Sequence, residues 1–191
     1  MRTPRRTRRP PLDGTGLWTH DAIRERYRRY CRAHHVQAPP WPQAGWLEER
    51  GWIAGVMDHL AERMKQGDLA AAEIGIEFIE EDGSFAFGRT TKCRVARALR
   101  HCRLTDGQMD RIRRRVIDML GRGYMPREFR EYARLLRRIG LGGHRAALER
   151  AAESGNAWVG WYGRYLRGEA PGKHPAWRRR GSGAGPRPWK P

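Results

Sequence analysis

The amino-acid sequence predicts an all-α protein of about eight helices in antiparallel hairpins, flanked by disordered basic tails. Apolar residues recur at helical spacing through the middle of the chain, and the alternation typical of strands is almost absent. Clusters of Gly, Pro, Asn and Asp separate these helical segments, and residues typical of helix N-caps precede several of the segments. The organisation is an Arg-rich arm at 1–12, one helical domain at 13–168, and a Gly/Pro/Arg-rich tail at 169–191.

The first predicted helix covers 20–35, and Thr19 is its expected N-cap. The residues expected on one face of this helix are mostly apolar or aromatic: Ile23, Tyr27, Tyr30, Cys31 and His34. Prolines at 39–42 then break the chain. A second helix is expected at 44–65, with an inward apolar set of Trp46, Ile53, Val56, Met57 and Leu60.

The third and fourth predicted helices carry opposite charge. The segment 69–81 follows an N-cap at Asp68, and its charged residues are all acids: Glu73, Glu77, Glu80 and Glu81. The segment 89–103 carries the cations Lys92, Arg94, Arg97, Arg100 and Arg103. Oppositely charged neighbours most simply pair across an antiparallel hairpin, so we expect much of this charge to serve the fold.

Four further helices are predicted. The fifth covers 107–122 and begins at a capping box formed by Thr105 and Gln108. The sixth runs from Pro126, a favourable first helical residue, to Ile139. A short seventh helix covers 144–153, and the eighth covers 157–166. We expect the eighth helix to bury its aromatic residues, which are Trp158, Trp161, Tyr162 and Tyr165.

Two architectures fit this helix pattern. Helices begin near 69, 107 and 143, so successive starts lie 38 and 36 residues apart. This spacing resembles HEAT-like helical pairs stacked in a short solenoid, although the hallmark residues of tetratricopeptide repeats are absent. An irregular helical bundle built from hairpins gives the same spacing.

The charge of the chain predicts an anionic partner. The chain holds 39 Lys and Arg against 21 Asp and Glu, a net charge of +18, and the tails hold ten of these net charges. Such a balance favours a non-enzymatic protein that contacts nucleic acid through the phosphate backbone. The candidate contacts lie on the fifth helix, on the sixth helix and in the tail: Arg111, Arg114, Arg115, Arg127, Arg130, Arg134, Arg137, Arg138, Arg178, Arg179 and Arg180.

Two alternatives remain open at this point. A HEAT-like scaffold could dock an acidic protein with the same cations, and an exposed Trp41 between prolines would suit such an interface. By analogy with HEAT-like DNA glycosylases, a base-excision enzyme would need Trp158 or Trp161 beside an acid in a basic groove. The sequence contains no phosphate loop, nucleophile elbow or zincin helix, so we assign no catalytic residue and no cofactor.

Composition also constrains metal binding and location. Cys31 with His34, and His101 with Cys102, lack the paired short spacing of zinc ligands, so no metal site is predicted. An odd cysteine count without framework spacing predicts reduced thiols and a cytoplasmic protein. No apolar run approaches the roughly 18 residues of a membrane span, so a membrane partner is not expected. The oligomeric state stays open.

Overall fold

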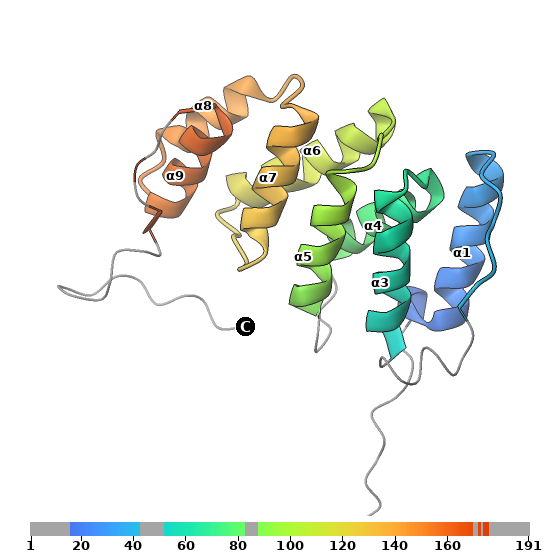
Figure 1. Ribbon diagram of the computed structural model, residues 1–191. Helices are drawn as coiled ribbons and strands as arrows, with labels where there is room; N and C mark the ends of the chain where they lie inside the picture. The colour runs from blue at the N-terminus through green and yellow to red at the C-terminus, as the bar shows by residue number, and fades with distance from the viewer. Residues whose placement is uncertain (1–15, 43–51, 83–87, 170–171, 173, 176–191) are drawn as a thin grey trace, which may run out of the picture.

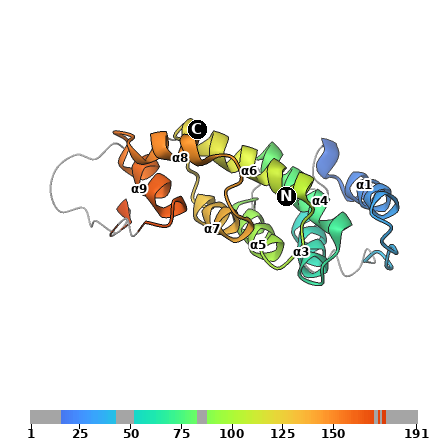
Figure 2. The ribbon, with the colours of Figure 1, turned by 90° about the horizontal axis from the view of Figure 1, so that it is seen from above.

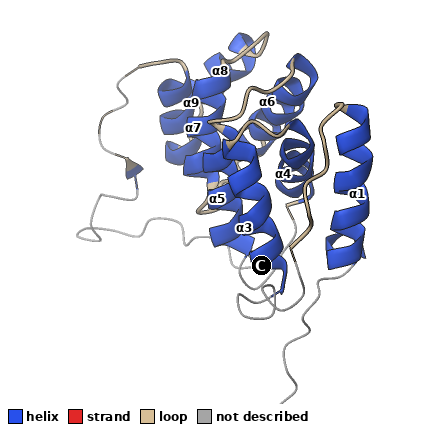
Figure 3. Ribbon diagram, turned by 45° about the vertical axis from the view of Figure 1, so that its right-hand side comes forward, coloured by secondary structure: helices blue, strands red, loops and turns tan. Residues whose placement is uncertain are grey.

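The computed structural model describes residues 16–42, 52–82, 88–169, 172 and 174–175, and these form an all-helical structure (Figure 1). Within these ranges the elements are a 3-10 helix and eight α-helices: η1 (Gly16–Trp18), α1 (His20–Ala33), α3 (Trp52–Lys65), α4 (Leu69–Glu81), α5 (Gly88–Leu99), α6 (Asp106–Gly121), α7 (Phe129–Ile139), α8 (Arg145–Ala152) and α9 (Ala157–Leu166). The described residues contain no strand (Figure 3), which confirms the predicted fold class. The predicted arm at 1–12 and the tail residues 176–191 lie outside the described residues.

The helices form two rows, seen from above in Figure 2. One row, here called the α5 row, contains α3, α5, α7 and α9, each packed against the next. The other, the α4 row, contains α4, α6 and α8, and α1 packs against α4 at its end. Helices that follow each other in sequence cross between the rows, because α4 contacts α3 and α5, α6 contacts α7, and α8 contacts α9. The HEAT-like interpretation of this packing stays a prediction.

Three predicted helix starts are confirmed with their caps. The Thr19 hydroxyl accepts the Ala22 N–H at 3.2 Å, and the Asp68 carboxylate accepts the Ala71 N–H at 3.0 Å. At α6, the Thr105 hydroxyl accepts the Gln108 N–H, and the Gln108 side chain accepts the Thr105 N–H in return. Each cap satisfies a backbone donor that the first helical turn leaves free, which fixes where the helix begins.

Two predicted boundaries are wrong. Helix α7 begins at Phe129 and not at Pro126, whose carbonyl instead closes a turn with the Phe129 N–H at 2.9 Å. Helix α5 ends at Leu99 and not at Arg103, because the His101 N–H bonds the Ala98 carbonyl at 2.9 Å and the chain turns toward α6. The predicted start of the second helix, 44–51, lies outside the described residues.

Helix α4 lies at the centre of the hydrophobic core. It contacts α1, α3, α5 and α6, and every residue from Ala70 to Ile79 except Glu77 is buried. Its small residues allow neighbours to approach closely, since a Cβ placed on Gly75 would lie 2.5 Å from the Met64 methyl group. The Trp18 ring closes one side of the core against Phe78, with ring centroids 4.9 Å apart. Burial on all sides explains why α4 is rich in Ala and Ile.

The proline-flanked Trp41 is part of this packing and is not an exposed anchor. Its ring is half-buried and lies 5.5 Å from the ring of Tyr27 between centroids. Its indole N–H donates to His20 Nε2 at 2.7 Å. The sequence alternative of an exposed Trp41 is therefore wrong, because α1 and α3 offer the ring both apolar contact and a hydrogen-bond acceptor.

The remaining chemical features of the fold are simple. Cys31, Cys93 and Cys102 are free thiols, and burial raises the pKa of Cys102 to about 11. No helix in the described ranges combines the length and apolar composition needed to cross a bilayer.

The contact between α8 and α9 predicts a sensitive glycine. A Cβ on Gly163 would lie 2.4 Å from the Ala152 backbone nitrogen and 2.7 Å from the Ala151 carbonyl carbon. We expect Gly163→Ala to lower the free energy of unfolding by about 2–3 kcal/mol, because neither backbone atom can move away easily. Chemical denaturation measures this loss. Gly121→Ala is the control, since its Cβ would meet nothing within 4 Å, and a comparable loss there would contradict the prediction.

Candidate functional site

The outward side of α7 consists almost entirely of arginine. The residues of α7 that are not buried are Arg130, Arg134, Arg137, Arg138 and Ile139. The opposite side packs into the core through the buried residues Phe129, Tyr132, Ala133, Leu135 and Leu136. This division gives α7 one mainly cationic surface and one mainly apolar surface, as the sequence periodicity predicted.

Arg97 of α5 and Arg100, which directly follows this helix, extend this surface. Arg134 Nη1 lies 3.1 Å from Glu131 Oε1, and Arg97 Nη2 lies 3.4 Å from the same oxygen. Arg100 Nη2 lies 3.2 Å from Glu131 Oε2. Three guanidinium groups, one from α5, one from the turn after it and one from α7, thus share one carboxylate. We call the resulting surface the arginine face, and it consists of Arg97, Arg100, Arg130, Arg134, Arg137 and Arg138.

The arginine face carries a large excess of positive charge. Glu131 is buried, and burial raises its pKa, but the hydrogen bond from Arg97 and the charges of Arg97, Arg134 and Arg100 outweigh this, so the net shift is downward. Among the described residues, no carboxylate lies within ion-pair distance of Arg130, Arg137 or Arg138. One ionised glutamate therefore balances six arginines, and the remaining charge faces solvent.

An aromatic cluster of α9 borders the arginine face. We call it the α9 aromatic cluster, and it contains Trp158, Trp161, Tyr162, Tyr165 and His174. The rings of Trp161 and Tyr165 are stacked with centroids 5.2 Å apart, and His174 lies 4.5 Å from Trp161 and 4.9 Å from Trp158. His174 Nε2 is 3.1 Å from the Tyr162 hydroxyl oxygen.

Arginines of α7 contact this cluster directly. The Arg137 guanidinium lies over the Tyr165 ring, 4.7 Å from its centroid, in cation–π geometry. Burial and the charge of Arg130 lower the pKa of His174. The cationic side chains of α7 and the aromatic side chains of α9 thus lie beside each other along neighbouring helices.

The prediction that α9 buries its aromatic residues is wrong in part. Tyr162 is buried against Phe129, with ring centroids 4.8 Å apart, but Trp161 and Tyr165 are half-buried and Trp158 is 37% exposed. The reason is the position of α9 at the end of the α5 row (Figure 2), where it packs on α8, α6 and α7 and no further helix of the described chain covers its outward side. Sequence periodicity gave these aromatic residues one common face without showing that solvent reaches it.

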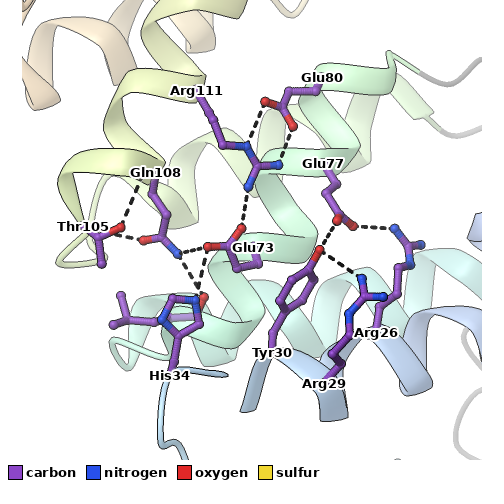
Figure 4. A network of polar contacts seen from close by, with 11 residues as sticks. Arg26, Arg29, Tyr30, His34, Glu73, Glu77, Glu80, Thr105, Gln108 and Arg111 are labelled. Atoms are coloured by element: carbon purple, nitrogen blue, oxygen red, sulfur yellow. Dashed lines mark hydrogen bonds and ion pairs between the residues drawn. The ribbon is translucent and has the colours of Figure 1, made fainter. Parts of the chain in front are cut away.

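Arg111, one of the predicted contacts, instead serves the fold (Figure 4). Its Nη1 lies 2.5 Å from Glu73 Oε2, and its Nε donates to Glu80 Oε1 at 3.0 Å. Hydrogen bonding to Glu80 raises the pKa of Arg111 despite its partial burial. The Gln108 side chain donates to Glu73 at 2.8 Å, and His34 Nε2 lies 3.2 Å from the same carboxylate. We call Glu73, Gln108, Arg111 and His34 the Glu73 network.

The other predicted arginines of α6 do not join the arginine face. Arg115 lies 3.8 Å from both Asp82 and Asp118 and donates to the Ile79 carbonyl at 3.4 Å. Arg114 is exposed, and its Nε donates to the Asp110 carbonyl at 3.4 Å. Because Arg111 and Arg115 point toward α4, the arginines of α6 and α7 do not form the single positive surface expected from sequence.

The predicted pairing of the acidic and basic helices also needs correction. The glutamates of α4 pair mainly with α1 and α6, since Glu77 accepts from Arg26 and Tyr30 of α1 and Glu80 pairs with Arg111 of α6. The cations of α5 pair with other neighbours: Arg94 with Asp58 of α3, and Arg97 with Glu131 of α7. The contact between Lys92 and Asp82 does join α5 to the end of α4.

The remaining candidate residues do not belong to the arginine face. Arg127 is exposed in the turn before α7, whereas Arg178, Arg179 and Arg180 lie outside the described residues. Within the described ranges, no three His, Cys, Asp or Glu side chains gather closely enough to hold a metal ion. The described contacts of Trp158 and Trp161 are aromatic rings and the Gly172 carbonyl, so no acid accompanies either residue as a base-excision site requires.

Comparison of the chain with protein-family models, with curated proteins and with solved structures finds no match.

The two uses of arginine lead to different expected effects of mutation. Arg111→Ala should lower the free energy of unfolding by about 3 kcal/mol, because Glu73 and Glu80 lose their ion-pair partner. This value is at the low end of the range for a broken buried ion pair, since both glutamates keep some contact with solvent. Arg138→Ala, on the arginine face, should change it by less than about 0.5 kcal/mol. Urea denaturation of both variants tests this, and equal losses would contradict the division.

The arginines around Glu131 predict a pH dependence of stability. A carboxylate with a lowered pKa stabilises the fold above its unfolded pKa, and this contribution is lost as the pH falls through the folded pKa. Glu131→Gln should therefore cost about 1.5–3 kcal/mol at neutral pH, and the gap to the wild type should narrow below about pH 4. Thermal unfolding across pH measures the gap. Glu149→Gln, which alters an exposed pair with Arg145 on α8, should show little effect at any pH.

Proposed function

We propose that this protein binds nucleic acid on the arginine face, chiefly through the phosphate backbone. The observation that carries the proposal is the excess of positive charge on this face: three of its six arginines pair with the buried carboxylate of Glu131, and the other three have no ion-pair partner among the described residues. Arginine suits this role because its planar guanidinium forms two parallel charge-assisted hydrogen bonds with phosphate oxygens.

The arrangement of the arginines supports the proposal beyond their number. Glu131 is buried beneath Arg97, Arg100 and Arg134, so it restrains these side chains without covering the surface with negative charge. Restrained side chains lose less conformational entropy when a ligand binds. By contrast, Arg111 and Arg115 are satisfied by acids of the fold and contribute little to an external ligand.

Two predictions from sequence are extensions of this proposal. The tail residues Arg178, Arg179 and Arg180 would add sequence-independent contacts with phosphates. An acidic protein is the second candidate partner, because its carboxylates would meet the same cations. The aromatic cluster beside the arginine face favours nucleic acid, whose bases offer π surfaces that acidic side chains lack.

Salt dependence of binding tests the proposal with the full chain. The double variant Arg130→Gln, Arg138→Gln removes two exposed charges of the arginine face, neither of them paired with a described carboxylate. We expect it to weaken binding of duplex DNA and to reduce the slope of log affinity against log salt by about 0.9 for each lost phosphate contact. Fluorescence anisotropy between about 50 and 200 mM salt measures both effects.

The matched control is Arg28→Gln, Arg32→Gln, which removes the same charge from exposed positions on α1. If both double variants weaken binding equally, the arginine face is not the site. If the wild type binds no nucleic acid at low salt, the proposal fails. Binding of polyglutamate that depends on Arg130 and Arg138, without binding of DNA, would instead establish the acidic-protein alternative.

A further inference from the structure

Trp158 is a large apolar side chain that the fold leaves open to solvent. Among the described residues, the exposed large hydrophobic side chains are Leu17, Tyr124 and Trp158. The exposure of Tyr124 has a structural explanation, because its hydroxyl donates to Asp82 at 2.6 Å. Trp158 retains 37% exposure although the His174 ring packs 4.9 Å away. With the half-buried rings of Trp161 and Tyr165 it forms a continuous aromatic surface, and such a surface is typical of a binding site for a ligand with an apolar part.

The position of Trp158 beside the arginine face indicates that a ligand would carry both negative charge and an apolar group. Trp158, Trp161 and Tyr165 follow one another on the outward side of α9, and from first to last they span about 10 Å along the helix axis. The Arg137 guanidinium lies over the Tyr165 ring, 4.7 Å from its centroid, so α7 places a cation directly on the α9 aromatic cluster. A ligand lying along α7 and α9 would meet positive charge on one side and aromatic rings on the other.

Contacts with the rest of the fold hold the rings of the α9 aromatic cluster in place. The Trp161 indole N–H donates to the Gly172 carbonyl at 3.2 Å, and Tyr162 packs edge-on against Phe129 of α7. His174 contacts Trp158, Trp161 and Tyr162 at once. These contacts restrict the rings before any ligand arrives, which lowers the entropy cost of stacking on them.

Building on the proposed function, we propose that the ligand is single-stranded nucleic acid, whose phosphates contact the arginine face while a base stacks on Trp158. A duplex offers the same phosphates, but its bases are stacked on each other and their π faces are closed. A single strand exposes both groups at once, and aromatic stacking of this kind needs no particular base sequence. The geometry of α7 and α9 thus fits a single strand better than a duplex.

The experiment compares three probes with the full-length wild type at one salt concentration. The probes are a thymidine oligonucleotide of about 20 nucleotides, an abasic strand of equal length, and a duplex of that length. We expect the thymidine strand to bind about tenfold or more tightly than the abasic strand, because base stacking on an aromatic residue contributes on that scale. In Trp158→Ala this preference should disappear, while affinity for the abasic strand stays unchanged.

Two control variants separate base stacking from general effects of mutation. Trp158→Phe retains an aromatic ring and should keep part of the preference, which separates stacking from a general effect on folding. Leu17→Ala alters another exposed apolar side chain, in η1 at the opposite end of the molecule (Figure 1), and should leave all three affinities unchanged. Circular dichroism confirms that each variant is helical.

The outcomes distinguish this inference from the proposed function. Equal affinity of the wild type for the thymidine and abasic strands would overturn the inference, as would a Trp158→Ala variant that retains the preference. If Arg130→Gln, Arg138→Gln still weakens every probe in that case, the arginine face stands as the site without stacking. If no probe binds at low salt, the proposed function itself fails.

Discussion

The arrangement of the two helical rows depends on a buried carboxylate, Glu73. A buried carboxylate must be compensated by charge and hydrogen bonds, or it destabilises the fold. Arg111 and Gln108 of α6 supply most of this compensation, and His34 approaches from the end of α1. These contacts set how α6 lies on α4 (Figure 4), and since α7 and α9 both pack on α6, they also influence where the candidate site lies.

Arginine has two distinct roles in this chain, and the facing helix decides which one applies. Opposite α4, which supplies Glu73, Glu77 and Glu80, arginines of α1 and α6 are held in ion pairs within the fold. On the outward side of α5 and α7, a single buried glutamate faces several arginines, and most of their charge is left for solvent or a ligand. Net charge therefore overstates what is available for binding, and its distribution over the two rows gives a better measure.

The candidate site could be predicted from sequence only in part. The arginines of α7 were identified because they recur opposite an apolar stripe, and the structure places them on one exposed surface. The contribution of Arg97 and Arg100 was missed, because they lie in and just after α5, which is separated from α7 in sequence by the whole of α6. The α9 aromatic cluster was visible as a periodic pattern, but the same pattern is typical of core residues, so its exposure could not be foreseen.

Local sequence signals account for the helices and for many of their ends. Apolar periodicity and the side chains of Thr19, Asp68 and Thr105 act within a few residues, so the information they carry is local. Which acid meets which arginine depends instead on how the helices pack. Helical periodicity places a side chain on a face, but the partner of that face comes from a helix distant in sequence. The sequence places both Arg111 and Arg130 on cationic helical surfaces. In the structure, Arg111 forms an ion pair with Glu73 within the fold, whereas Arg130 is exposed and is a candidate contact for a ligand.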